Sequence, residues 1–122
     1  MLTPVETIKL LKNQPDQNFA AGEVIFKSGE KGKVMYGIVK GEVDLLLHEE
    51  VIETIGEGDI FGQGALVQLD HSRLSTAIAK TDCTLAVMDL QHFLFAIEQT
   101  PLFAVEVMRN FSNRLRHLKN EL

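Results

Sequence analysis

The pattern of apolar and polar positions divides the chain into a helical beginning, a strand-rich middle and a helical end. At the beginning, Thr3 is a helix N-cap, Pro4 is suited to the first helical position, and Glu6 completes a capping box. The apolar residues that follow share one helical face, at Val5, Ile8 and Leu11. We expect this helix to end before Pro15 and to cover the main body of the domain.

The middle of the chain consists of short β-branched or aromatic runs separated by polar, glycine-bearing turns. Six runs are predicted strands, at residues 23–26, 34–39, 43–48, 51–55, 75–79 and 84–88. Their spacing of about ten residues is typical of an antiparallel sandwich or barrel. Six strand residues are expected to be mainly core: Ile38, Val51, Ile60, Phe61, Ile78 and Val87. Met35 and Tyr36 are also expected to pack inside.

The pattern after Asp89 is helical again. A short helix is predicted over Leu90–Gln99, and Pro101 opens a longer helix that continues to the end of the chain. Apolar residues in the longer helix alternate at spacings of four and three, at Ala104, Met108, Phe111, Leu115, Leu118 and Leu122. This heptad seam predicts a homodimer formed through Pro101 to Leu122, although a helix packed on its own domain has a similar apolar face.

Composition limits the possible classes of function. The chain has 122 residues, 45% hydrophobic and 24% charged, and a net charge of −5. These values predict one globular domain and argue against a general nucleic-acid binder, because no excess of basic charge is available. Cys83 is the single cysteine, so no disulfide framework is possible and a reducing cytoplasm is the expected location. We predict no membrane partner, because no apolar run is long enough to span a bilayer and no signal peptide is evident.

The stretch from Ile60 to Ala79 has the features of a phosphate-binding loop. Two glycines, Gly62 and Gly64, precede one turn of good helix formers, and a polar loop then leads to Arg73. Exposed backbone N–H groups at the start of a helix attract anions, and the planar guanidinium of arginine suits a phosphate. The residues alone therefore predict a small anion site.

Other chemistries find little support in the sequence. The four histidines lie far apart, without the spacing of metal ligands, so no metal site is predicted. Asp70, His71 and Ser72 are triad residue types, but as neighbours in one loop they cannot be placed as a triad. Enzyme activity is not expected. The basic residues of the last helix are interpreted as cations near a helix C-terminus: Arg109, Arg114, Arg116 and Lys119.

Four glycine-containing segments, in this order and spacing, resemble the cyclic nucleotide-binding domain family. They are residues 22–26, 29–32, 35–43 and 55–62, and the resemblance covers nearly the whole chain. It implies a mainly β fold: a double-stranded β-helix, or jelly roll, barrel with an N-terminal helix and two C-terminal helices. The single domain, 1–122, would comprise an N-terminal helical segment (1–18), the jelly roll with the phosphate loop (19–89) and the C-terminal helices (90–122).

The same resemblance implies a role for each residue of the loop. Arg73 takes the position of the family's phosphate-binding arginine, and the backbone of Gly64, Ala65 and Leu66, preceded by Gly62, takes the position of the phosphate cradle. Gln63 stands where the family usually has a glutamate that accepts the ribose 2′-hydroxyl, so the hydrogen bond would lose its charge assistance. Leu74 follows the arginine where some members place a hydroxyl residue, and Ser75 is a candidate to contact the ligand instead.

The implied function is a cAMP- or cGMP-sensing regulatory domain that moves its C-terminal helices and acts on an unknown protein effector. No cofactor other than the nucleotide is implied. Relatives that regulate transcription continue into a DNA-reading element that this sequence lacks, so we expect either a stand-alone sensor or a trimmed regulator. Gln63 keeps a second interpretation open, in which the fold has lost or retuned ligand binding and serves as a dimerisation or protein-interaction module.

Overall fold

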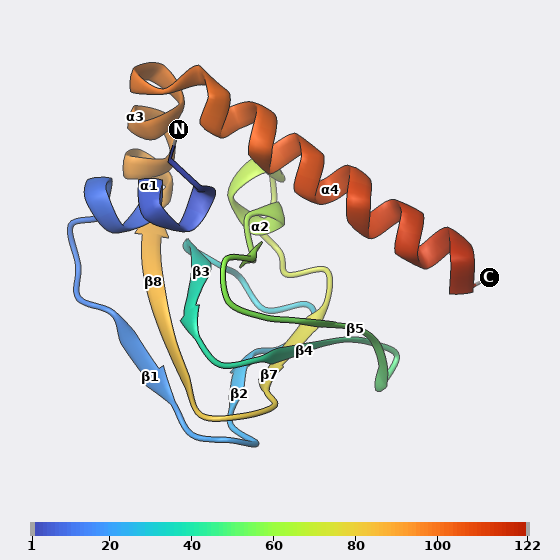
Figure 1. Ribbon diagram of the computed structural model, residues 1–122. Helices are drawn as coiled ribbons and strands as arrows, with labels where there is room; N and C mark the ends of the chain where they lie inside the picture. Colours follow the sequence, from blue (N-terminus) through green and yellow to red (C-terminus); the bar gives the residue numbers. More distant parts are fainter. Residues whose placement is uncertain (1, 122) are drawn as a thin grey trace.

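The computed structural model describes residues 2–121, and the side chains of residues 2–119. Two four-stranded antiparallel sheets form a jelly roll, with one helix before it, one short helix inside it and two helices after it (Figure 1). The helices are α1 (Pro4–Leu11), α2 (Gly64–Val67), α3 (Leu90–Gln99) and α4 (Pro101–Glu121). The strands are β1 (Gln17–Phe19), β2 (Val24–Phe26), β3 (Val34–Lys40), β4 (Val43–Leu47), β5 (Glu50–Ile55), β6 (Ile60–Phe61), β7 (Thr76–Ala79) and β8 (Cys83–Asp89).

The strand order is β1-β8-β3-β6 in the first sheet and β2-β7-β4-β5 in the second. The first sheet is buried on both sides, because alternate residues of its central strands face two separate cores. Tyr36 and Ile38 of β3 lie in the core between the two sheets, whereas Met35 of the same strand lies in the core beneath the helices. Leu85 and Met88 of β8 divide in the same way. The predicted mainly β jelly roll with flanking helices is therefore confirmed.

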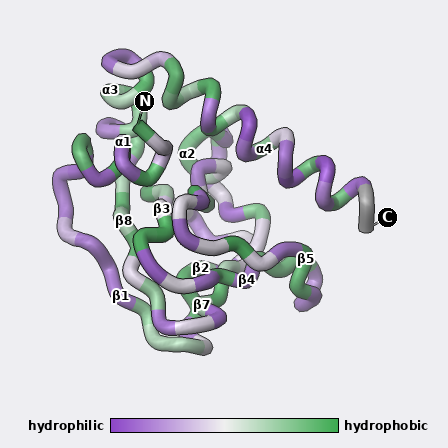
Figure 2. The backbone as a smooth tube through the Cα atoms, in the orientation of Figure 1, coloured by the Kyte–Doolittle hydropathy of each residue, from purple (hydrophilic) through white to green (hydrophobic). Residues whose placement is uncertain are grey.

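The helices cover the outer face of the first sheet (Figure 1). Thr3 caps α1 by accepting a hydrogen bond from the backbone N–H of Glu6, as the sequence predicts. Gly37 of β3 is required for this packing, because a Cβ atom there would lie 3.2 Å from both Ile8 and Val5 of α1. The longer helix α4 starts beside α3 and runs across α2, and its later turns are predominantly hydrophilic (Figure 2).

The structure departs from the sequence prediction at two short strands and at two core residues. The six predicted runs do not include β1, two of whose three residues are polar, or β6, although Ile60 and Phe61 of β6 are expected as core strand residues. The prediction that Val51 is core is wrong, since the residue is 54% exposed on β5, an edge strand of the second sheet. Ile78 is also outside both cores, because it is half-buried on β7, where the alternate residues Ala77 and Ala79 are the buried ones. Ile38, Ile60, Phe61 and Val87 are buried as predicted.

The predicted heptad seam on α4 is only partly exposed. Its own domain covers Phe103 and Val107, which lie outside the seam, and Phe111 packs against the same core. Met108 and Leu115 are 60% and 67% exposed. Leu122 lies outside the described residues. No helix within residues 2–121 is long and apolar enough to cross a membrane.

Candidate phosphate loop

The predicted loop connects β6 of the first sheet to β7 of the second. It places Arg73 against the backbone of two glycines, Gly32 and Gly62. The turn at residues 29–32 pairs with residues 71–73: Gly29 donates its N–H to the carbonyl of Arg73, and Arg73 donates its N–H to that of Glu30, both at 2.8 Å. Lys31 adds a side-chain hydrogen bond to the carbonyl of Asp70 at 2.7 Å. Two segments that are 39 or more residues apart in sequence therefore hold the arginine in place.

The guanidinium of Arg73 is turned inward, and the residue is only 6% exposed. Its Nη1 donates to the carbonyl of Gly62 and its Nη2 to that of Val34, each at 2.7 Å. It also lies over the ring of Phe26, with Cζ 4.2 Å from the centroid, which is a favourable cation–π distance. The contacts hold the arginine in one conformation and leave its three remaining N–H groups for another acceptor.

The positive charge of Arg73 has no carboxylate partner among the described side chains. Burial lowers the pKa of the guanidinium, because removal from water disfavours its charged form, and the nearby Tyr36 and Glu30 partly oppose this change. Burial of a cation that contacts only carbonyls and an aromatic ring carries an unfavourable desolvation free energy. An anionic ligand would relieve it.

Two glycines make room for this arginine. A Cβ atom at Gly32 would lie 2.2 Å from Nε of Arg73 and 2.4 Å from its Cζ. A Cβ atom at Gly62 would lie 2.9 Å from Nη1, and this glycine also has φ of +81°, which side-chain-bearing residues rarely adopt. The backbone must therefore approach the guanidinium closely on both sides.

The short helix α2 begins directly after Gln63. The backbone N–H groups of Gly64 and Ala65 are the first two of this helix and have no partner among the described residues, as expected at a helix start. Ala65 and Leu66 are buried as whole residues, whereas Gly64 is half-buried. The N–H of Leu66 already donates to the carbonyl of Gln63 at 3.0 Å, so the unpaired N–H groups of this segment are those of Gly64 and Ala65. His71 lies nearby, with Nδ1 2.9 Å from the carbonyl of Ala65.

Gln63 is placed differently from the sequence-based expectation. The residue is 1% exposed, and its Nε2 donates to Oδ1 of Asn110 on α4 at 2.8 Å. Its Oε1 is buried without a hydrogen-bond partner. The amide therefore connects the loop to the last helix, and its oxygen is the atom of this side chain that has no hydrogen bond among the described residues.

Leu74 and Ser75, the two candidate ligand contacts that follow Arg73, are more exposed than the arginine. Leu74 is 82% exposed, and Ser75 is half-buried. The hydroxyl of the neighbouring Thr76 accepts the backbone N–H of Ser28 at 3.0 Å. The structure therefore brings Arg73, Gly62 and the start of α2 together and leaves Leu74 at the surface.

Sequence reasoning misses three residues that adjoin the site: Asn110, Arg114 and Glu53. Arg114 lies near Asn110 and donates Nη2 to the carbonyl of Ile60 at 2.9 Å. Its Nε is 3.2 Å from Oε2 of Glu53, as an ion pair without the alignment of a hydrogen bond. A signal was present in the sequence, because Asn110 and Arg114 are four residues apart on the same helical face as Val107 and Phe111.

Comparison with known proteins gives a family match for most of the chain. Residues 16–100 match the sequence model of a family described as "Cyclic nucleotide-binding domain". The chain is 38% identical to a cAMP-dependent protein kinase regulatory subunit of Eremothecium gossypii over 56% of its length, and 43% identical to human Rap guanine nucleotide exchange factor 3 over 60%. The matched parts are 15% and 8% of those proteins, so this chain corresponds to a small part of each.

The fold is also found among solved structures. The catabolite activator protein of Thermus thermophilus superimposes with a TM-score of 0.76 at 24% identity, and the alignment covers 94% of this chain and 55% of the other. At that level of identity the likeness establishes the fold alone.

Proposed function

This chain belongs to the cyclic nucleotide-binding domain family, and we propose that it is a regulatory domain that senses cAMP or cGMP. In this proposal the cyclic phosphate binds the backbone of Gly64, Ala65 and Leu66 and the guanidinium of Arg73, while the ribose lies beside Gln63. Its role is binding rather than catalysis, in a cytoplasmic setting. The single observation that carries the proposal is the buried guanidinium of Arg73, which has no carboxylate partner among the described side chains.

The signal would pass from the ligand to the last two helices. Helix α4 is bonded to the loop through Asn110, so a ligand that favours one position of α4 would change the surface offered to an unidentified protein effector. We propose that two copies of the chain pair through α4, on the side that carries Met108 and Leu115.

Isothermal titration with cAMP and cGMP tests the proposal. We expect heat of binding from at least one nucleotide and a loss of affinity of about tenfold or more in Arg73→Ala, because hydrogen bonds to charged groups contribute about 1.5–3 kcal/mol. Arg116→Ala, which removes an exposed arginine of α4, is the matched control and should bind as the unmodified chain does. Binding that survives Arg73→Ala unchanged would contradict the phosphate assignment.

A second candidate function is a dimerisation or interaction module that no longer binds nucleotide. Gln63 favours it, because a neutral side chain that is already bonded to α4 replaces the usual charged acceptor. Absence of heat from both nucleotides at millimolar concentration, from a chain that remains folded by circular dichroism, would support this candidate over the sensor.

A further inference from the structure

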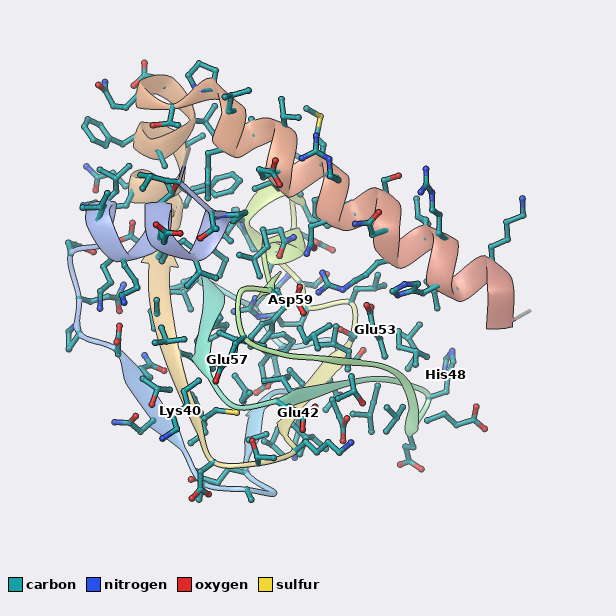
Figure 3. All side chains as sticks on the ribbon, in the orientation of Figure 1. Lys40, Glu42, His48, Glu53, Glu57 and Asp59 are labelled. Atoms are coloured by element: carbon teal, nitrogen blue, oxygen red, sulfur yellow. The ribbon has the colours of Figure 1, made fainter. Side chains whose placement is uncertain are left out.

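Gln63 is the first member of a chain of polar side chains that crosses from the loop to α4 and ends on β5. Its Nε2 donates to Oδ1 of Asn110, the same oxygen receives Nη1 of Arg114, and Arg114 pairs with Glu53. Figure 3 shows Glu53 on β5, below α4. Glu53 also accepts from the more exposed His117, with 2.9 Å between Nδ1 and Oε1.

The chemistry of this chain fixes which way each amide faces. A guanidinium can only donate, so Asn110 must direct its oxygen toward Arg114. The nitrogen of Asn110 then lies 3.3 Å from the carbonyl of Ile60. Because Gln63 meets the same Asn110 oxygen, Gln63 in turn must present its nitrogen.

This order leaves Oε1 of Gln63 as a buried acceptor without a partner among the described residues. Such atoms are uncommon in folded proteins and unfavourable, because the desolvated group has lost its bond to water. The unpaired atom is the one the ribose 2′-hydroxyl would reach in the proposed function. A glutamate at this position would place a carboxylate oxygen next to the oxygen of Asn110, and two acceptors cannot form a hydrogen bond.

We propose that Asn110 is a positioning residue for the ligand, which holds Gln63 so that its Oε1 accepts the ribose hydroxyl. This inference rests on the proposed function and adds to it a residue on α4. Glutamine is then the side chain that the hydrogen bond to Asn110 requires, rather than a sign of lost nucleotide binding. Because one bond joins Gln63 to α4, hydroxyl recognition and docking of α4 stabilise each other.

The test compares cAMP with 2′-deoxy-cAMP by isothermal titration, or the corresponding cGMP pair if only cGMP binds. The unmodified chain should prefer the hydroxylated nucleotide by about two- to tenfold, the range of one neutral hydrogen bond. In Asn110→Ala and in Asn110→Leu, which preserves bulk, this preference should fall below about twofold while affinity for the deoxy nucleotide changes little. A purely structural role would weaken both nucleotides equally and leave the preference intact.

Two further variants sharpen the result. Asn110→Asp keeps an oxygen for both Gln63 and Arg114 and should retain the preference, whereas Asn113→Ala, an exposed asparagine on the same helix, should behave as the unmodified chain. An unchanged preference in both Asn110→Ala and Asn110→Leu overturns the inference and leaves the proposed function standing. Absence of binding to every nucleotide by the unmodified chain overturns the proposed function, and the positioning role with it.

Discussion

At the scale of single residues, Arg73 depends on a neighbour that lacks a side chain. Gly32 is buried against the guanidinium, and an added methyl group would overlap Nε and Cζ. We predict that Gly32→Ala displaces Arg73, destabilises the fold by about 1–3 kcal/mol, as overpacking usually does, and weakens nucleotide binding. Urea unfolding and isothermal titration measure the two effects.

Gly56→Ala is the matched control for this prediction. The nearest atom to a Cβ there is the carbonyl oxygen of Gly41 at 4.0 Å, and Gly56 does not have a left-handed backbone. The control should therefore change stability and binding little. If Gly32→Ala binds nucleotide as tightly as Gly56→Ala does, the tight packing around Arg73 is not needed for the site.

Much of the site could be predicted from single residues, because Gly62, Gly64 and Arg73 follow one another within one short stretch of sequence. The sequence places Gly62, Gln63 and Arg73 in one loop, but it does not indicate that Arg73 turns inward onto Phe26 and the carbonyl of Val34. Those contacts come from strands 39 and more residues away in the chain. No local pattern encodes them.

At the scale of elements, the start of α3 contains an N-cap whose strength depends on pH. Asp89 accepts the backbone N–H of His92 at 2.9 Å. That bond favours the charged carboxylate and lowers the pKa of Asp89 from its usual value of 3.8. The stabilisation is therefore complete above the unfolded-state pKa and is lost as the pH falls through the lower folded-state value.

We predict that Asp89→Ala costs about 1 kcal/mol at neutral pH, the usual cost of losing an N-cap. Asp89→Asn keeps an acceptor and should lose little stability at neutral pH, but it removes the titrating group. Urea unfolding at neutral pH and at about pH 3 should therefore show a smaller acid-induced loss for both variants than for the unmodified chain. An equal acid-induced loss in all three would exclude Asp89 as a source of the pH dependence.

Elements with strong local signals follow the sequence closely. Helix α3 begins and ends as predicted, because Asp89 caps its start and the residue before Pro101 cannot continue it. The strands β1 and β6 carry no such signal, since they exist through pairing with β8 and β3. Val51 is exposed on β5, which is at the edge of the second sheet, and the order of strands in the sheet cannot be read from a local pattern.

At the scale of the whole molecule, α4 divides its apolar residues between its own domain and the solvent. Phe103 and Val107 are buried on the domain side, whereas Met108 and Leu115 point away from it. The heptad pattern in the sequence includes Phe111, which packs on the domain, together with the exposed Met108 and Leu115. The pattern therefore does not separate a docked helix from a pairing one. A contiguous patch of exposed apolar side chains is typical of a surface that binds a partner.

We predict that the chain is a dimer that Leu115→Glu converts to a monomer, because a charge on an apolar helix seam is costly to bury. Light scattering coupled to size exclusion measures the mass directly. Leu10→Glu is a closely matched control, since Leu10 of α1 has the same 67% exposure and lies outside α4. A dimer that persists in Leu115→Glu, or one that Leu10→Glu disrupts equally, would place the interface elsewhere on the molecule. A monomer already in the unmodified chain would remove pairing through α4 from the mechanism and leave α4 to act through its contact with Gln63.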